Sequence, residues 1–310
     1  MYRLTCAGDL HIAERYDISQ IARLLTKIAL HANTTQELIL LGDTFHNSKV
    51  SPLELLTFIN FLKQVTVPVI VIAGNHDTLG ENSLIDWIPQ IFPIMASKES
   101  LVIKREGLDI LLAHYNVEES VMGAYDFKLK SGLSVDQLGV PLALLGHIHK
   151  PQNIQGAKTQ AVHPGSIFYI DYNERNDTKS FVDLTIDGTS YKIEHIPLDP
   201  DPIMQFETTP EGVDGIIEQV LKDLDLKTRV KIVVNYEDPN INKREILKKF
   251  DKYHFKEKKF SFVYDSPNSI VHNSVVTEDN KLVELEEFLM ANTSTEIVTL
   301  IKEYLQRGQS

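Results

Sequence analysis

Cysteine is almost absent from this chain, and long apolar runs are missing altogether. Cys6 is the single cysteine among 310 residues, so an internal disulfide cannot form and a thiolate-rich structural zinc site is excluded. No apolar run approaches the roughly 20 residues that a membrane helix needs, and no basic stretch followed by an apolar one marks a secretion signal. We therefore expect a cytoplasmic protein with no membrane attachment.

Positive charge is also in short supply. Lysine and arginine number 31 against 43 aspartates and glutamates, which gives a formal net charge of -12. Because the protein as a whole repels nucleic acid, any contact with DNA must come from local positive features. The 43% of hydrophobic and 24% of charged residues are ordinary globular usage, so one large folded domain with something smaller is expected.

Short apolar runs alternate with helical patterns in the first half of the chain. The runs at 4–7, 38–41 and 69–73 each end in a turn that contains glycine, and patterns of period 3.6 separate them. Further strands are expected at 110–113, 142–145, 166–170, 181–186 and 191–196. This βαβ rhythm predicts an α/β fold, a two-sheet sandwich whose strand ends carry loops on one edge, where the active sites of such sheets collect.

Three prolines within residues 197–202 predict a linker between domains. Beyond the linker, helical and strand patterns alternate over about 70 residues, which predicts a small α/β capping domain. Two helical patterns, at 281–291 and 294–306, close the sequence as a helical pair. The predicted domains are a catalytic domain at 1–198, a DNA-contacting capping domain at 199–272 and a helical segment at 273–310.

Polar side chains follow the predicted strands, and their chemistry is that of metal ligands. Aspartate, asparagine and histidine without cysteine suit divalent manganese, iron or zinc. Seven side chains can share two ions: Asp9, His11 and His149 at one, Asn75, His114 and His147 at the other, and Asp43 as a bridge between both. The alternative, that these residues are only caps and satisfied turn polars, explains their joint spacing poorly.

The charge of such a centre fits an anionic phosphodiester. Two divalent cations bring +4 and two aspartates bring about -2, so the centre stays positive within an acidic protein. Ions in this place clamp a phosphate, acidify a water and stabilise an in-line transition state. His76 is left over from the ligand set, and we expect it to protonate or hydrogen-bond the leaving oxygen, with Asp77 fixing its orientation.

The segments GDLH, GDTFH, GNHD, AHYN and GHIH, in this order over residues 8–149, resemble the five signature motifs of the calcineurin-like metallophosphoesterases. LGHIHKPQ, followed by HPGS and a Phe-Val-Asp-Leu strand, is similar to the SbcD-type nuclease subunits, which process DNA double-strand breaks with the ATPase SbcC. The resemblance implies the metallophosphoesterase fold and two ions, with Mn²⁺ the implied metal, on the seven ligands. It also implies exo- or endonuclease action in DNA repair or recombination, a homodimer, and an SbcC-like coiled-coil ATPase as partner.

Three further positions enter through the resemblance. His46, in GDTFH, matches a position that lines the substrate cleft in the family; supporting a metal ligand or simply lying on the surface is the alternative. Two positions depart from the pattern: His163 precedes Pro-Gly-Ser where tyrosine is usual, and Tyr115 follows His114 where glutamine is frequent. Neither departure removes a ligand, so both bear on substrate detail.

Residues 243–259 carry eight basic side chains against three acidic ones, a local charge of +5 in an acidic protein. The interleaved Phe250, Tyr253 and Phe255 either stack on bases or form the core of the capping domain, and the cations either follow phosphates or face solvent. We expect contact with DNA by Lys243, Arg244, Lys248, Lys249, Lys252, Lys256, Lys258 and Lys259.

The narrow apolar stripes of the terminal helical pair fit a groove, and we expect this pair to dock on the coiled-coil base of the ATPase, with packing against each other as the alternative. Two other functions are compatible with the fold: a small-molecule phosphodiesterase or pyrophosphatase on the same ligands, and a scaffold without catalysis. The residues from 199 onward speak against the first, and the complete ligand set speaks against the second.

Overall fold

A computed structural model of the chain describes residues 1–264, apart from 80–81, 84, 86–87 and 129–131. The chain divides into one compact unit, Met1–Val263, and a second part, Tyr264–Ser310, in which Tyr264 is the described residue. Within the described ranges, no helix is both long enough and apolar enough to cross a membrane. The predicted helical pair at 281–291 and 294–306 lies outside the described residues.

The first strand of the chain lies inside a six-stranded sheet. Its strands are β1 (Tyr2–Ala7), β2 (Glu37–Leu41), β3 (Val69–Ile72), β6 (Met95–Ser97), β14 (Ser180–Asp187) and β15 (Ser190–Pro197). β1, β2, β3 and β6 run parallel, and β14 and β15 extend the sheet beyond β1 with antiparallel pairing. β2 and β3 are buried along their whole length, as parallel strands between two layers are.

A five-stranded sheet forms the second layer of the sandwich. Its strands are β7 (Leu101–Arg105), β8 (Leu108–Ala113), β11 (Leu142–Leu145), β12 (Gln152–Gln155) and β13 (Gln160–His163). β8, β11 and β13 run parallel in its centre, and β7 and β12 are antiparallel at its edges. Side chains of both sheets, among them Cys6, Ile39, Ile110 and Leu144, form one buried core. The predicted α/β two-sheet sandwich is confirmed.

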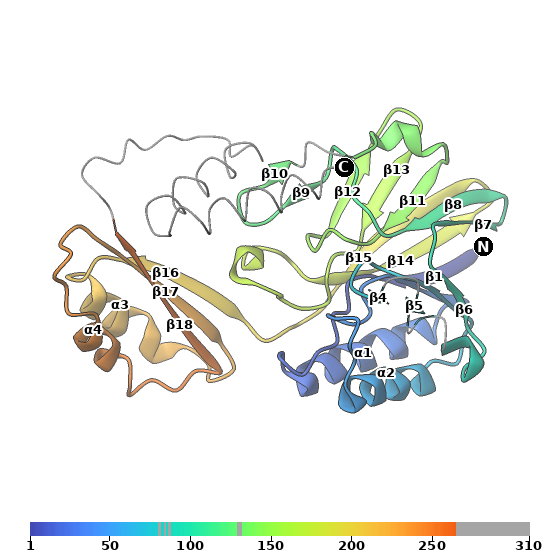
Figure 1. The fold of residues 1–310 in the computed structure, drawn as a ribbon. Coiled ribbons are helices and arrows are strands. Elements are labelled where there is room, and N and C mark those ends of the chain that lie inside the picture. The colour runs from blue at the N-terminus through green and yellow to red at the C-terminus, as the bar shows by residue number, and fades with distance from the viewer. Residues whose placement is uncertain (80–81, 84, 86–87, 129–131, 265–310) are drawn as a thin grey trace, which may run out of the picture. The chain divides into compact units, whose positions relative to one another are not determined.

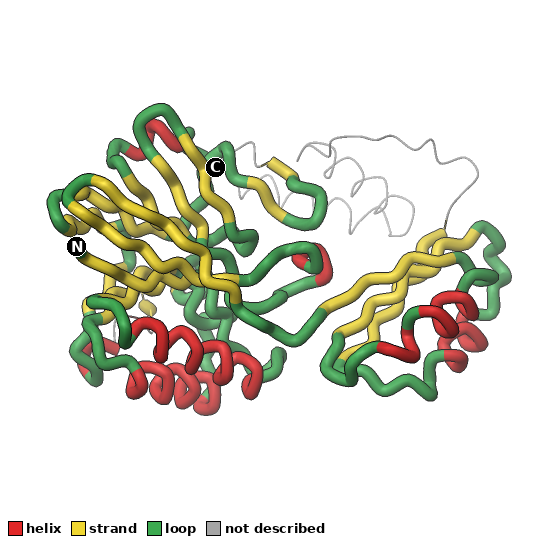
Figure 2. The backbone as a smooth tube through the Cα atoms, turned by 180° about the vertical axis from the view of Figure 1, so that it is seen from behind, coloured by secondary structure: helices red, strands yellow, loops and turns green. Residues whose placement is uncertain are grey.

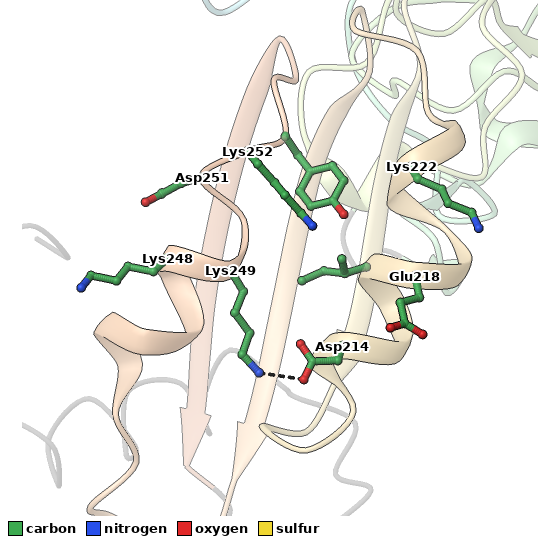
Figure 3. Close-up of a pocket in the computed structure, with 9 residues that line it drawn as sticks. Asp214, Glu218, Lys222, Lys248, Lys249, Asp251 and Lys252 are labelled. Atoms are coloured by element: carbon green, nitrogen blue, oxygen red, sulfur yellow. Dashed lines mark hydrogen bonds and ion pairs between the residues drawn. The ribbon is translucent and has the colours of Figure 1, made fainter.

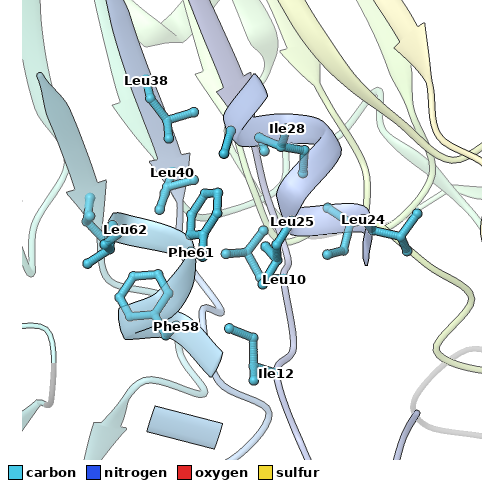
Figure 4. Close-up of a cluster of buried hydrophobic side chains, with 14 of the residues drawn as sticks. Leu10, Ile12, Leu24, Leu25, Ile28, Leu38, Leu40, Phe58, Phe61 and Leu62 are labelled. Carbon is cyan, nitrogen blue, oxygen red and sulfur yellow. The ribbon is translucent and has the colours of Figure 1, made fainter. Parts of the chain in front are cut away.

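Two helices, α1 (Ile18–Ala32) and α2 (Pro52–Gln64), cover the other face of the six-stranded sheet (Figure 1). The Asp17 side chain caps α1, and Ser51 with Glu54 forms a capping box at the start of α2. Figure 4 shows the contact layer, in which Leu25 of α1 and Phe61 of α2 lie near Leu40 of β2. Each fully buried side chain of this kind contributes about 1.5–3 kcal/mol, so this layer anchors the helices on the sheet.

A separate three-stranded sheet follows residues 198–202. Its strands are β16 (Ile203–Thr208), β17 (Arg229–Tyr236) and β18 (Glu257–Tyr264), with β17 in the middle. The helices α3 (Val213–Gln219) and α4 (Lys243–Lys249) both lie on one face of this sheet, as seen from either side in Figures 1 and 2. Val213, Ile232, Ile246 and Phe250 share its buried core. This module has its own core, distinct from those of the sandwich.

Several short elements complete the described chain. They are the strands β4 (Thr78–Leu79), β5 (Asn82–Ser83), β9 (Val121–Met122) and β10 (Phe127–Lys128) and the single 3₁₀ turns Ile88–Gln90, Val135–Leu138, Tyr172–Glu174 and Leu221–Asp223. The predicted strand at 166–170 is wrong. Ile167 and Phe168 are buried there, but the backbone is irregular and the Ser166 hydroxyl donates to the Phe168 carbonyl. Burial without sheet pairing explains this apolar run.

Candidate metal centre

Five loops at the carboxyl ends of parallel strands carry the predicted ligands. β1 leads to Asp9 and His11, β2 to Asp43, β3 to Asn75 and His76, β8 to His114, and β11 to His147 and His149. The first three strands belong to the six-stranded sheet and the last two to the five-stranded sheet. Because these strand ends meet at one edge of the sandwich, side chains far apart in the sequence converge there.

Four of the predicted ligands have left-handed backbone torsions. The φ angle is +50° at Asp9, +42° at His11, +47° at Asp43 and +79° at His147. Residues other than glycine adopt this region rarely, and where a fold imposes it the strained positions gather at functional sites. Backbone strain and ligand chemistry therefore mark the same edge of the sandwich.

Two glycines let the loops approach one another around His114. A Cβ at Gly42, whose φ is +81°, would collide with the His114 ring, and a Cβ at Gly146 would lie 2.5 Å from its Nδ1. That Nδ1 donates to the carbonyl oxygen of Leu41 at 2.7 Å. The bond leaves Nε2 facing the centre of the site. A larger residue at either glycine would displace this candidate ligand.

Asp9, His11 and His149 form one group. The Nε2 atoms of His11 and His149 lie 3.1 Å apart, and His149 Nε2 lies 3.8 Å from Asp9 Oδ1. One oxygen and two nitrogens, all within 4.8 Å of one another, have the donor set of a divalent cation site. Asp9 is fully buried, and among the described residues its Oδ2 has no hydrogen-bond partner. Such an orphaned oxygen is costly, and a cation in this space would satisfy it.

Asn75, His114 and His147 form the neighbouring group. Asn75 Oδ1 lies 3.1 Å from His114 Nε2 and 3.2 Å from His147 Nδ1. Asp43 lies between the groups, with its Oδ2 3.3 Å from His114 Nε2 and 3.7 Å from His11 Nε2. The structure thus brings all seven predicted ligands together, with Asp43 in a position to serve two ions.

The carboxylates of Asp9 and Asp43 create an electrostatic field that favours positive charge at the ligand-bearing edge of the sandwich. Burial opposes ionisation of Asp43, but the hydrogen bond and charge of His114 outweigh it and hold the pKa of Asp43 below its usual range. Burial alone would lower the pKa of His114, yet Asp43 and Asp9 raise it to about 9. Burial and the neighbouring His149 hold the pKa of His11 well below its ordinary value, so this ring is a neutral ligand. A divalent cation would compete with the proton on His114 for the same field.

His76 lies beside these groups. Its backbone N–H donates to Asp43 Oδ1 at 2.9 Å, and its Nε2 lies 3.9 Å from Asp43 Oδ2. Its Nδ1 donates to the carbonyl oxygen of His46 at 2.7 Å, so this carbonyl orients the ring. Asp77, the predicted orienting partner, is the next residue in the chain. Its buried carboxylate accepts from the backbone N–H groups of Thr44, Phe45 and Gly74, which ties the loops after β2 and β3 together.

The His46 side chain contacts both a candidate ligand and a candidate catalytic residue. Its Nδ1 lies 3.2 Å from His11 Nδ1, and its ring stacks on that of His76 at a centroid distance of 5.3 Å. Its Nε2 lies 3.2 Å from an Arg15 guanidinium nitrogen. A place in the substrate cleft and support of His11 both fit this position, so the role of His46 stays a prediction.

A buried ion-pair network, which the sequence did not reveal, contacts His149 at Nδ1, while Nε2 faces the other candidate ligands. His149 Nδ1 donates to Glu174 Oε1 at 2.7 Å, and the buried ammonium of Lys179 lies 2.7 Å from Glu174 Oε2. Lys179 also donates to the His149 carbonyl and to the Ser166 hydroxyl, and lies 3.4 Å from Asp177. Burial opposes ionisation of Glu174, but Lys179 and His149 lower its pKa to about 2. The network therefore directs His149 Nε2 toward the metal centre.

Replacing Glu174 with glutamine is expected to weaken the binding of divalent ions by about tenfold to hundredfold, because a neutral amide supports the His149 ring less strongly than a carboxylate does. Calorimetric titration with Mn²⁺ measures this affinity. Glu194→Gln, at an exposed position of β15, removes the same charge far from the ring and is the matched control. Equal affinities of the two variants would contradict the role of Glu174.

His163 lies behind the loop that carries His147 and is fully buried. Its Nδ1 donates to the carbonyls of Leu145 and Gly146, at 3.0 and 3.2 Å, and its Nε2 lies 3.0 Å from the Ser120 hydroxyl. Burial lowers the pKa of His163 to about 4. The ring is therefore neutral at pH 7, and it links the backbone next to His147 to Ser120.

Folding stability should fall in acid partly because of His163. The unfolded chain protonates this ring near pH 6.5 and the folded chain only near pH 4, so protons favour unfolding as the pH drops between these values. The difference of about 2.5 between the pKa values of His163 in the unfolded and folded chain corresponds to roughly 3 kcal/mol of unfolding free energy. His163→Gln keeps a donor and an acceptor, and it should lose less stability between pH 7 and pH 4 in urea unfolding. The same acid sensitivity in both proteins would refute this account.

The predicted DNA-binding residues of segment 243–259 do not form one free surface. Six of the eight contact other groups of the protein: Lys243, Lys249, Lys252, Lys256, Lys258 and Lys259. Arg244, Lys248 and Lys252 are exposed and follow one another at intervals of four residues. Phe250 is 1% exposed in the core of the module, so it cannot stack on bases.

An open pocket of about 700 Å³ lies beside these cations, between α3 and α4. Figure 3 shows Lys248 and Lys252 on its rim together with Asp214, to which Lys249 is paired at 2.8 Å. Acidic and basic side chains alternate around it, so the pocket as a whole has no strong preference for an anion.

Comparison with known proteins assigns the two-sheet sandwich to a known protein superfamily. A family model for the calcineurin-like phosphoesterase superfamily domain matches residues 3–188, which is more than half of the chain. No curated protein matches the sequence.

Matching solved structures include a predicted phosphoesterase from Streptococcus pneumoniae, with 14% identity, 63% of this chain and 89% of that chain covered, and a TM-score of 0.39. An archaeal phosphodiesterase matches with 14% identity, 63% and 99% covered, and a TM-score of 0.41. Vps29 complexed with zinc from Entamoeba histolytica matches with 20% identity, 64% and 99% covered, and a TM-score of 0.37. At these TM-scores the three structures bear on neither substrate nor partner.

Proposed function

The chain belongs to the calcineurin-like phosphoesterase superfamily, and on this premise we propose that it is a two-metal nuclease acting on the phosphodiester bonds of DNA. The fold of this superfamily implies divalent metal ions, and the clustered Asp and His side chains fit them. The observation that carries the proposal is the convergence of seven ligand side chains in two adjoining groups, with Asp43 between the groups. Such an arrangement suits an anion that bridges two cations.

In this proposal the seven ligands divide between two ions. Asp9, His11 and His149 would hold one ion, Asn75, His114 and His147 the other, and Asp43 both. Bound divalent ions supply positive charge to the phosphate and lower the pKa of a water to the neutral range. Mn²⁺ suits a donor set of oxygen and imidazole nitrogen, and we propose it as the working ion.

His76 acts on the leaving oxygen in this proposal. The His46 carbonyl accepts from Nδ1, so Nε2 is the nitrogen left to hydrogen-bond the substrate or to pass it a proton. The backbone N–H of His76 is bonded to Asp43, which keeps the ring next to the ligand groups. Proximity to the ligands, rather than a coordinating role, supports this assignment.

Contact with DNA outside the metal centre is assigned to the exposed cations of α4 and the turn that follows it. Reversing Arg244, Lys248 and Lys252 to glutamate should weaken DNA binding and reduce its salt dependence, since each lost phosphate contact removes about 0.7–0.9 from the slope of log K against log salt. Fluorescence anisotropy at several salt concentrations measures both effects. Reversing the exposed Lys63, Lys104 and Lys192 changes the net charge equally and is the control. An equal slope of log K against log salt in both triple variants would show that Arg244, Lys248 and Lys252 do not contact DNA phosphates.

The partner proposals rest on the sequence resemblance to SbcD-type subunits. The segment 273–310 would dock on an SbcC-like coiled-coil ATPase, and the nuclease would work as a homodimer in the cytoplasm during break repair. Deleting the residues after Asn280 should leave a folded, metal-dependent nuclease that no longer co-purifies with the ATPase. A retained complex would refute the docking assignment.

The nuclease proposal is tested with linear duplex DNA and Mn²⁺, with and without chelator, beside bis-p-nitrophenyl phosphate and cyclic nucleotides. We expect metal-dependent degradation of the DNA. Cleavage of the small substrates alone, even with the ATPase present, would favour a small-molecule phosphodiesterase. Absence of hydrolysis on every substrate would favour a scaffold that has kept its ligands.

A further inference from the structure

The hairpin formed by β9 and β10 carries two exposed aromatic side chains. Its strands pair antiparallel, with Val121 opposite Lys128 and Met122 opposite Phe127. Tyr125 is 66% exposed and Phe127 is 64% exposed, and their ring centroids lie 6.1 Å apart. Rings this exposed contribute little to the stability of the fold, and their faces are accessible to a ligand.

Hydrogen bonds join the base of this hairpin to the loop that carries His147 and His149. The Gln152 side chain accepts from the backbone N–H of Val121 at 2.9 Å and donates to the Val121 carbonyl at 2.8 Å. The same amide donates to the Lys150 carbonyl at 3.0 Å. The hairpin is therefore fixed to the residues that follow two candidate ligands.

The tip of the hairpin is fixed to the same region. Lys150, the residue after His149, forms an ion pair with Asp126, which lies between the two aromatic residues. The guanidinium carbon of Arg175, the residue after Glu174, lies 5.8 Å from the centroid of the Tyr125 ring. Lys150 thus follows a candidate ligand in the sequence. Arg175 follows Glu174, which accepts a hydrogen bond from that same ligand, His149, at 2.7 Å. The tip of the hairpin thus contacts the residues that follow His149 and Glu174 in the chain.

Aromatic rings beside cations are the combination that binds unpaired nucleotides. A ring stacks on a base of any sequence, while lysine and arginine meet the phosphates. Arg175 faces the Tyr125 ring, and Lys128 follows Phe127 as an exposed residue. Bases inside a duplex are already stacked on one another, so the rings can be used only by a strand whose bases are free.

We propose that Tyr125 and Phe127 form a stacking platform for the unpaired bases of a DNA strand whose phosphate lies at the metal centre. The inference rests on the proposed function and narrows its substrate class to DNA with single-stranded or frayed ends. Stacking of the end nucleotides fixes the position of the phosphodiester bond beside them relative to His147 and His149.

The test compares oligothymidylate with an abasic oligonucleotide of the same length and charge. Fluorescence anisotropy of the full chain, with Ca²⁺ in place of Mn²⁺ to preserve the DNA, gives the two Kd values. The wild-type protein should bind oligothymidylate about 5- to 100-fold more tightly, because stacking acts only on bases. The double variant Tyr125→Ala/Phe127→Ala should bring the ratio of the two Kd values close to one. Tyr125→Phe/Phe127→Tyr keeps both rings and should keep the ratio.

Each remaining outcome decides the matter. A wild-type protein that binds both oligonucleotides equally, or an alanine variant that keeps the wild-type ratio, would overturn the platform and leave the nuclease proposal standing. Loss of structure is excluded when the alanine variant keeps the wild-type Kd for the abasic oligonucleotide, because that affinity does not depend on stacking. A wild-type protein that hydrolyses bis-p-nitrophenyl phosphate but binds neither oligonucleotide would overturn the DNA function and the platform together.

Discussion

Phosphodiester hydrolysis should fall by about 10³-fold or more when Asp43 is replaced with asparagine. Asp43 Oδ2 lies within 3.7 Å of ring nitrogens in both ligand groups, so its charge would serve both of the proposed ions. Losing a bridging charge removes several kcal/mol of stabilisation, and each 1.36 kcal/mol is a factor of ten in rate. Asparagine can still accept the His76 N–H and tolerates the φ of +47°, so the loop should keep its shape. Hydrolysis of bis-p-nitrophenyl phosphate with Mn²⁺ measures the effect.

The control for this substitution is Asp187→Asn, which removes the same charge at the exposed end of β14 and should keep the wild-type rate. Calorimetry on the Asp43 variant should also show weaker Mn²⁺ binding, because one ligand of each ion has lost its charge. A rate within tenfold of the wild type would contradict the shared position of Asp43.

Replacing Lys179 with methionine is expected to lower the free energy of unfolding by about 3–5 kcal/mol. The side chain of Lys179 is fully buried, and it is the cation for the buried carboxylates of Glu174 and Asp177. Methionine fills a similar volume but removes the buried cation that the two carboxylates share, which leaves Asp177 with Lys150 at 3.9 Å and Glu174 with the His149 ring at 2.7 Å. Urea unfolding followed by circular dichroism measures the loss.

Two further variants isolate the charge from the shape of Lys179. Lys192→Met, at a side chain that is 77% exposed, should change stability by about 0.5 kcal/mol or less. Adding Glu174→Gln to Lys179→Met should recover part of the loss, because the buried negative charge goes with its partner. A loss below about 1 kcal/mol in the single variant would contradict a buried ion pair.

The convergence of the candidate ligands at one edge could be predicted because these residues obey a local rule. His114 follows a buried strand directly, and Asp9 and Asp43 each follow one after a single glycine. Parallel strands of a sandwich bring their carboxyl ends to one edge. The α/β class and the capping box at Ser51 followed from patterns within a few residues in the same way. Features of this kind depend on neighbours in the sequence and can be predicted without coordinates.

The supporting contacts could not be predicted, because they join residues that only the fold brings together. The link from Glu174 to His149 spans 25 residues, and nothing in the composition around Lys179 distinguishes a buried lysine from a solvated one. The bonds from the backbone N–H groups of Thr44 and Phe45 to the Asp77 carboxylate likewise join two loops that lie more than 30 residues apart in the sequence. The irregular stretch at 166–170 could not be predicted for a related reason. Its apolar residues predict burial, but they do not show whether the backbone pairs with a neighbouring strand.

The left-handed torsions at Asp9, His11, Asp43 and His147 also restrict which residues can replace these four. A β-branched residue at such a torsion meets the backbone, so valine, isoleucine or threonine would be disfavoured even if no ion were ever bound. Asparagine, aspartate, histidine and glycine tolerate the region best, and three of these four carry cation-binding atoms. Substitutions that the backbone admits here will therefore tend to retune ion selectivity before they abolish binding.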